Sequence, residues 1–144
     1  MLVEDDLSHG RIMFTVMHPR EFVIAEDSTG NVDTIYREYS VTARSLAEKF
    51  GYAVLPAAVR NKYDKNPYSD VKIVRAIYPR SDRDSSKLSA TNKKWASVWY
   101  TPEADDNHKI LFEGGYDYFP GAVWRYKTVG NEIYGRSPCM DAYV

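Results

Sequence analysis

A stretch near the end of the chain, residues 114–140, most constrains what this sequence can fold into. It reads GGYDYFPGAVWRYKTVGNEIYGRSPCM and combines four tyrosines, one phenylalanine and one tryptophan with five glycines and two prolines. Large aromatic side chains favour extensive contacts, whereas glycine and proline interrupt regular backbone ladders. The stretch lacks a nucleophile paired with a base. We therefore predict irregular β structure that packs and docks rather than catalyses.

Length and composition predict one globular domain over residues 1–144. The chain is 44% hydrophobic and 27% charged, which is near the average for folded proteins and argues against disorder. Its single cysteine, Cys139, excludes an internal disulfide and is compatible with a reducing compartment. The acidic start and the lack of a long apolar run predict neither a signal peptide nor a membrane span.

The net charge of −1 hides a basic middle segment. Residues 60–94 carry ten bases and four acids, which gives +6, while residues 1–59 and 95–144 sum to −4 and −3. A solvated surface is the ordinary interpretation of such a charge run. The alternative is a nucleic-acid-binding module that uses this segment. Its candidate contacts are Lys62, Lys65, Arg83, Lys87, Lys93 and Lys94.

Alternating and β-branched segments predict strands, and turn residues separate them. The predicted strands cover residues 11–18, 21–27, 32–41, 71–78, 95–101, 109–113 and 123–127. Ser28 to Asn31 offers turn chemistry between the second and third of these, so they should form a hairpin. The polar residues 80–93 predict an exposed loop.

Two short helices and the start of a third interrupt this pattern. Apolar residues spaced as in a helix follow Thr42, the expected N-cap, and Gly51 is placed to end that helix. Pro56 is suited to the first turn of a second helix, over residues 57–63. A third should begin at Ser137 and Pro138 and be truncated near residues 137–144. The predicted class is α+β, with a mostly antiparallel sheet and two or three short helices.

The residues that could carry chemistry form no recognisable constellation. Cys139 is interpreted as a small buried residue because no histidine lies near it in the sequence. Asp105, Asp106 and His108 are interpreted as a polar hairpin tip, since calcium and zinc sites need other spacings. We therefore predict no enzyme activity, no metal and no cofactor.

The spaced aromatic residues have two interpretations. Trp95, Trp99, Tyr116 and Tyr118 could stack nucleobases or sugar rings. Packing in a core or an interface is the favoured interpretation, because aromatic side chains dominate both.

Five blocks in order resemble a known family. They are EDSTGNVDTIYREYSVTARSLAEKFG at residues 26–51, IYPR at 77–80, GGYDYFP at 114–120, WRY at 124–126 and YGRSP-M at 134–140. In order and spacing they resemble the head-to-tail connecting proteins of short-tailed phages, the portal proteins. A phage and a prophage are both consistent with this resemblance.

The resemblance implies a structural virion protein. Portal subunits form a homo-oligomeric ring, usually of twelve copies, at one vertex of the capsid. Double-stranded DNA passes through the ring during packaging and ejection; the packaging terminase docks on it first, and tail adaptor proteins later. The implied location is the capsid portal vertex of the virion, and the bacterial host cytoplasm before assembly.

The resemblance also implies that residues 1–144 are a wing-region fragment of a longer subunit, whose stem, clip and crown lie elsewhere. The WRY block should then lie inside a wing-type sheet. The family motif Tyr134, Gly135, Arg136, Ser137 and Pro138 should form the turn that leads into a helix toward the stem.

Overall fold

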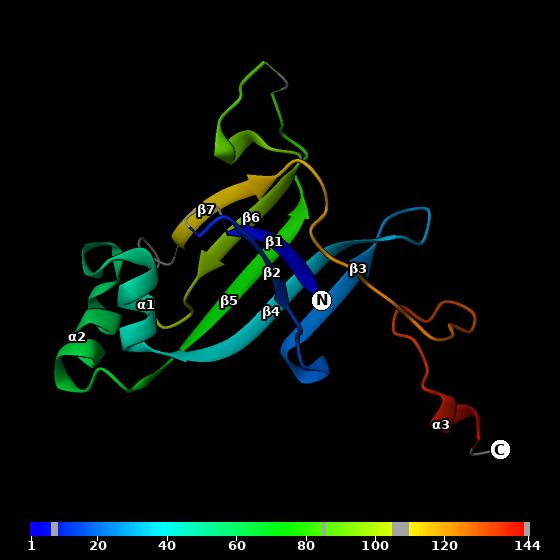
Figure 1. Ribbon diagram of the computed structural model, residues 1–144, viewed down its shortest axis with the longest axis horizontal. Coiled ribbons are helices and arrows are strands. Elements are labelled where there is room, and N and C mark those ends of the chain that lie inside the picture. Colours follow the sequence, from blue (N-terminus) through cyan, green and yellow to red (C-terminus); the bar gives the residue numbers. More distant parts are fainter. Residues whose placement is uncertain (7–8, 85, 105–109, 143–144) are drawn as a thin grey trace.

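Figure 1 shows the computed structural model of the chain, which describes residues 1–6, 9–84, 86–104 and 110–142. Its strands are β1 (Leu2–Asp6), β2 (Arg11–Thr15), β3 (Phe22–Glu26), β4 (Val32–Thr42), β5 (Asp70–Pro79), β6 (Trp95–Tyr100) and β7 (Ile110–Tyr116). Its helices are α1 (Ala43–Phe50), α2 (Ala57–Lys65) and α3 (Pro138–Asp141), with short 3-10 turns at Pro19–Glu21, Tyr52–Val54 and Ala90–Asn92. The α+β class predicted from the sequence is confirmed.

The main sheet is an antiparallel meander in the order β3-β4-β5-β6-β7. The predicted hairpin is present, since β3 and β4 pair around a turn in which Gly30 has a φ of +82°. Helices α1 and α2 form the connection between β4 and β5 and lie at one end of the sheet (Figure 1). A separate two-stranded sheet, β1 and β2, lies across the main sheet.

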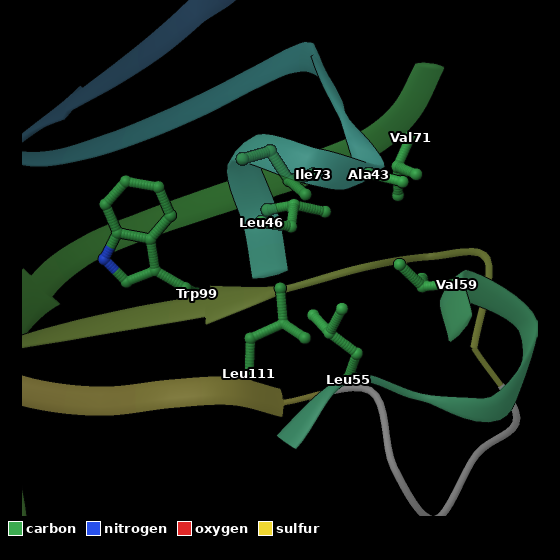
Figure 2. Close-up of a cluster of buried hydrophobic side chains, with 8 residues drawn as sticks. All are labelled: Ala43, Leu46, Leu55, Val59, Val71, Ile73, Trp99 and Leu111. Atoms are coloured by element: carbon green, nitrogen blue, oxygen red, sulfur yellow. The ribbon is translucent and has the colours of Figure 1, made fainter. Parts of the chain in front are cut away.

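One face of the sheet carries two apolar clusters. Cross-strand partners share a face, so Ile35 and Ile77 project to the same side as Val41 and Val71. At the helical end, α1 and α2 cover the first cluster (Figure 2). Its buried members are Ala43, Leu46, Leu55, Val59, Val71, Ile73, Trp99 and Leu111.

The second cluster lies at the other end of the same face. Leu2 of β1 packs there with Met17, Ile24, Ile35 and Ile77. The β1–β2 hairpin thus covers the part of the sheet that the helices leave open. The opposite face stays partly exposed, as Val23 (58%) and its cross-strand partner Tyr36 (43%) show.

Helix α1 begins and ends where its sequence predicts. The Thr42 hydroxyl accepts a hydrogen bond from the Ser45 amide at 3.3 Å, which satisfies one of the free amides of the first turn. Gly51 follows the helix with a φ of +87°, a conformation that side chains with a Cβ rarely adopt. The buried face of α1 carries Ala43 and Leu46. Helix α2 follows Pro56 and extends two residues beyond the predicted end.

The structure corrects two strand predictions. Residues 123–127 do not form a strand and make a single isolated bridge, between Lys127 and Arg136. Trp124 there is 82% exposed, so the WRY block does not lie inside a sheet. The physical reason is that a strand needs a partner, and the chain leaves the sheet after β7. The strand predicted over residues 11–18 is also shorter than expected: it is β2, and it ends at Thr15.

Strand β1 was missed by the sequence interpretation. Its sequence, LVEDD, is rich in acids, which are depleted in strands. Its carboxylates are tolerated because arginines of other elements reach them: Glu4 pairs with Arg75, and Asp6 pairs with Arg11. None of the helices in the described ranges is long and apolar enough to cross a membrane.

Candidate functional site

The middle of the covered sheet face holds a buried ionic network instead of apolar side chains. Arg75 of β5 is 5% exposed and donates two hydrogen bonds to Glu4 of β1, from Nη1 to Oε2 at 2.8 Å and from Nη2 to Oε1 at 2.6 Å. Its Nη2 also lies 2.6 Å from the hydroxyl of Tyr116 on β7, which in turn donates to Glu4. A fork of two parallel bonds is the strong geometry for an arginine–carboxylate pair. The network therefore holds the β1–β2 hairpin against the main sheet.

The protonation of this network follows from its surroundings. Burial alone would raise the pKa of Glu4, but the hydrogen bonds and the charge of Arg75 outweigh it, so the pKa lies below its ordinary value. Burial and the hydrogen bond to Glu4 raise the pKa of Tyr116 to about 12, although the charge of Arg75 opposes that rise. Glu4 is thus a carboxylate and Tyr116 a neutral phenol near neutral pH. Neither is poised to exchange a proton.

Trp99 joins the ionic network to the helical cluster. The Arg75 guanidinium lies 4.6 Å from the Trp99 ring centre, and the Lys49 Nζ of α1 lies 3.7 Å from it. Burial and the nearby charge of Arg75 both lower the pKa of Lys49. These cation–π contacts place positive charge on the ring face, where the π electrons attract it. The predicted packing role of Trp99, which is 6% exposed, is confirmed.

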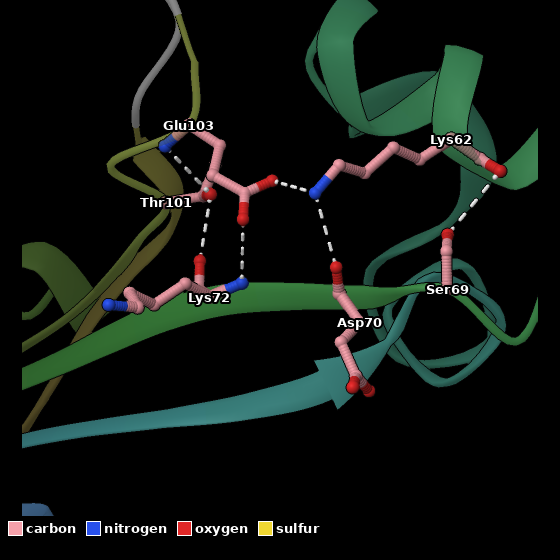
Figure 3. A network of polar contacts seen from close by, with 6 residues as sticks. All are labelled: Lys62, Ser69, Asp70, Lys72, Thr101 and Glu103. Atoms are coloured by element: carbon pink, nitrogen blue, oxygen red, sulfur yellow. Dashed lines mark hydrogen bonds and ion pairs between the residues drawn. The ribbon is translucent and has the colours of Figure 1, made fainter.

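A second polar network ties α2 to the sheet (Figure 3). The Lys62 Nζ donates to the Glu103 Oε2 at 2.6 Å and to the backbone oxygen of Asp70 at 3.2 Å. The other Glu103 oxygen accepts from the Lys72 amide at 3.2 Å, and the Thr101 hydroxyl donates to the Lys72 carbonyl at 2.9 Å. Lys62 is therefore committed to a structural ion pair.

The six predicted nucleic-acid contacts do not form one surface. Lys62 and Lys65 lie on α2, before β5 begins, whereas the other four follow the end of β5. A ten-residue strand at about 3.3 Å per residue separates the two groups by roughly 30 Å. Three of the six, Lys62, Lys87 and Lys93, have carboxylate partners in Glu103, Asp84 and Asp117. Nucleic-acid contact by these residues stays a prediction that the geometry does not favour.

The structure gives no support for the residues that were considered for catalysis or metal binding. Cys139 is exposed on α3, which corrects its interpretation as a buried residue: α3 has no buried residue and packs on no core. Asp105, Asp106 and His108 lie outside the described residues. Within the described ranges, no group of three or more His, Cys, Asp or Glu side chains could hold a metal ion.

The family motif lies in a C-terminal arm, residues 117–142, which extends past the edge of β3 (Figure 1). The Tyr134 hydroxyl accepts a hydrogen bond from the Ile24 amide at 3.2 Å and so occupies part of the outer edge of β3. Gly135 packs so closely on Arg125 that a Cβ added to it would lie 2.9 Å from the Arg125 Cβ. Glycine at this position is what allows the two segments of the arm to meet.

The other motif residues shape the end of the arm. Arg136 donates to Glu132, and its amide donates to the Lys127 carbonyl at 2.7 Å. Ser137 and Pro138 are the N-cap and the first residue of α3, as their sequence predicted. The chain bends at Tyr134, and Arg136 lies in an isolated bridge to Lys127 before α3 begins at Pro138. The role of the whole motif as a turn toward the stem stays a prediction.

Arg125 anchors the arm to the body of the protein. Its guanidinium pairs with Glu26 at the end of β3 and donates to the carbonyls of Gly30 at 3.2 Å and Ile133 at 3.0 Å. A groove of about 380 Å³ lies between the arm and β3, lined in part by Phe22, Ile24 and Tyr134. Val123, Trp124 and Tyr126 of the arm also line this groove.

Sequence reasoning missed the residue that organises this site. Arg75 stands inside the apolar strand VKIVRAIY, where a buried charge is costly unless a partner meets it. That position was the signal that an acid from elsewhere in the chain had to approach the centre of the sheet. The identity of the acid, Glu4, could not be read from the spacing.

Comparisons with known proteins identify a family that this chain matches. Residues 1–144 match the family model described as bacteriophage head to tail connecting protein. A probable portal protein of Bordetella phage BPP-1 is 38% identical over 123 residues, which are 85% of this chain and 22% of that protein. The portal protein of Salmonella phage epsilon15 is 31% identical over 117 residues, 81% of this chain and 21% of that protein. The chain thus spans about a fifth of the length of these curated relatives.

Proposed function

This chain belongs to the family of bacteriophage head to tail connecting proteins, as its sequence blocks predicted, and we propose that it is a wing-region part of a portal subunit. The observation that carries this proposal is the match over residues 1–144, together with relatives that are named portal proteins. In the full-length subunit, copies would assemble into a ring, of twelve in the usual case, at the portal vertex of the virion. Double-stranded DNA would pass through that ring.

The architecture suits a mechanical part rather than an enzyme. Arg75, Glu4 and Tyr116 join three segments that are far apart in the sequence, and the bonds between them are charge-assisted. Lys62 and Glu103 similarly fix α2 to the sheet. Ion pairs that are geometrically well defined and partly shielded from water resist screening better than exposed pairs. We therefore propose that this domain has a structural role without catalysis.

The proposed partners follow from that role. Flanking copies of the subunit would contact this domain, while the capsid, the packaging terminase and the tail adaptor proteins would contact the assembled ring. The chain's net charge of −1 argues against direct binding of this domain to DNA phosphates, because such binding requires a concentrated positive surface. Before assembly the subunit would reside in the cytoplasm of the bacterial host.

Electron microscopy and mass photometry of the full-length protein test the proposal. The expected result is rings with a central channel and a mass of many subunits. A full-length protein that stays monomeric at micromolar concentration, under conditions that support assembly of other portals, would overturn it.

A further inference from the structure

The C-terminal arm begins as a short extended segment on the outer edge of β1. The Val3 amide donates to the Pro120 carbonyl at 2.9 Å, and the Ala122 amide donates to the Met1 carbonyl at 2.9 Å. Figure 1 shows the chain passing the start of β1 before it runs on past β3. Strand β1 therefore lies between β2 on one side and residues 120–122 on the other.

The first part of the arm, residues 117–122, also packs on the apolar cluster beneath the hairpin, and we call it the arm root. Leu2, which is buried in the second cluster, forms an isolated antiparallel bridge with Gly121. Phe119 packs against the same cluster. A Cβ added to Gly121 would lie 2.8 Å from the Ile35 Cδ1 and 2.6 Å from the Phe119 Cε1, so glycine lets this backbone approach closely. The hairpin and the arm root therefore share one cluster.

The hairpin has little else to hold it on the domain. Among the described residues of β1 and β2, only Leu2 is buried. The other strong tie is ionic: Glu4 pairs with Arg75 of β5 and accepts a hydrogen bond from Tyr116, the last residue before the arm root. A segment that buries so little apolar surface opens at a lower free energy than the strands of the main sheet.

We propose that the β1–β2 hairpin and the arm root form a clasp, which opens and closes as one unit and is kept closed by the Glu4–Arg75 pair. In the described structure neither side chain of the pair hydrogen-bonds to residues 117–122. Breaking the pair nevertheless releases the arm root, because β1 carries both the Glu4 carboxylate and the backbone groups that bind the arm root. By reciprocity, freeing the arm root weakens the pair.

The clasp couples the hairpin to the arm that ends in α3. Helix α3 has no buried residue of its own, so the arm determines where it lies. A partner that displaces the hairpin therefore also releases the start of the arm, and a partner that pulls on the arm root loosens the hairpin. This conformational coupling is a property of the fold and goes beyond the proposed function.

Hydrogen exchange in the full-length subunit, read by mass spectrometry at single-residue resolution, tests one direction of the coupling. Glu4→Gln removes the carboxylate charge and keeps the size of the side chain. We expect the amides of Val3 and Ala122 to exchange about tenfold faster, the effect of turning a charge-assisted bond into a neutral one. Unchanged exchange at Ala122 would overturn the clasp.

Leu46→Ala is the control for unfolding of the whole domain. Leu46 packs in the helical cluster, which stays intact when the clasp opens. The variant should therefore speed exchange at Val74 in the middle of β5 and leave Val3 and Ala122 unchanged. Equal acceleration at all three amides would show that only global unfolding exposes them, and it would also overturn the clasp.

Carboxyl footprinting tests the other direction. Ala122→Pro removes the amide that donates to Met1, at a residue whose side chain is exposed. We expect the Glu4 carboxylate to react about tenfold faster with a carbodiimide and an amine, because it becomes accessible when the clasp opens. Val123→Pro is the matched control, since the Val123 amide makes no hydrogen bond within the described residues. It should leave the labelling of Glu4 unchanged.

The outcomes separate this inference from the proposed function. Labelling of Glu4 that Ala122→Pro does not change would show that the hairpin and the arm root move independently, and it would overturn the clasp while leaving the portal assignment standing. A full-length protein that never forms rings would instead contradict the proposed function, whatever the exchange and the footprinting show. The far-UV circular dichroism of each variant should match the wild type.

Discussion

Arg75 and Glu4 lie 71 positions apart in the chain, yet two hydrogen bonds of 2.8 and 2.6 Å join them at the centre of the sheet. The side chains are 6% and 17% exposed. The pair divides the covered face into two apolar clusters and determines where the N-terminal hairpin lies. A charge at that position is acceptable only because its partner arrives from a distant part of the sequence.

Removing both members of the Arg75–Glu4 pair should cost less stability than the two single losses added together. We expect Arg75→Met to lower the free energy of unfolding by about 3 kcal/mol, because it leaves the Glu4 carboxylate partly buried without its partner. The double variant with Glu4→Leu should lose less than the sum of the two single variants. Urea unfolding followed by tryptophan fluorescence measures all three. Additive losses would show that the two side chains do not interact.

Acid should weaken the fold in part through Glu4. Its pKa in the folded chain lies below the ordinary value of 4.5, so the pair's contribution is fully present above pH 4.5 and is lost as the pH falls through the lower, folded-state pKa. We expect the free energy of unfolding to decrease more steeply below pH 4.5 in the wild type than in Glu4→Gln. Urea unfolding at a series of pH values measures both slopes. Parallel profiles would contradict the assignment.

The core under α1 should respond to truncation as a tightly packed site. Leu46 is 2% exposed and packs in the helical cluster (Figure 2), so Leu46→Ala should cost about 2–5 kcal/mol. Leu88→Ala makes the same chemical change at a residue that is 99% exposed, and it should change stability by less than about 0.5 kcal/mol. Thermal and urea unfolding compare the two variants. Equal effects would mean that Leu46 is not buried.

The arm should loosen when Tyr134 loses its hydroxyl. Tyr134→Phe leaves the Ile24 amide without its acceptor at the edge of β3, which should cost about 1 kcal/mol and speed amide exchange at Ile24. Tyr126→Phe is the matched control on the same arm, because its ring is 53% exposed and packs beside Trp124. Hydrogen exchange followed by NMR separates them. Unchanged protection of the Ile24 amide in Tyr134→Phe would refute the contact.

DNA binding by the basic segment should be weak. The two groups of bases lie at opposite ends of β5, and Lys62 is committed to Glu103, so few phosphates can be neutralised together. We expect affinity for duplex DNA near the non-specific range, with a shallow dependence on salt. Fluorescence anisotropy at 50 and 200 mM salt measures both. A steep salt slope that Lys93→Ala and Lys94→Ala reduce would revive the nucleic-acid interpretation.

Helices and turns were predictable where capping residues, apolar spacing and glycines lie close together in the sequence. The Thr42 cap, the helical spacing of Ala43 and Leu46, and Gly51 after the helix all lie in one short segment, so α1 was predicted within a residue. The strand predicted at residues 123–127 was wrong because it depended on a contact with another segment. Strand propensity is real there, but a strand exists only if a partner backbone is available.

By itself, the sequence determined the α+β class, the hairpin of β3 and β4, the two helices between β4 and β5, the start of α3 at Ser137 and Pro138, and the family. These features depend on periodicity, capping and turn chemistry, which act over a few residues. Only the tertiary structure decided that Glu4 meets Arg75, that the acidic β1 is a strand, and that Ile12, Phe14 and Trp124 stay exposed. Such contacts join distant segments, and their position depends on which surfaces remain unburied after the whole chain has packed.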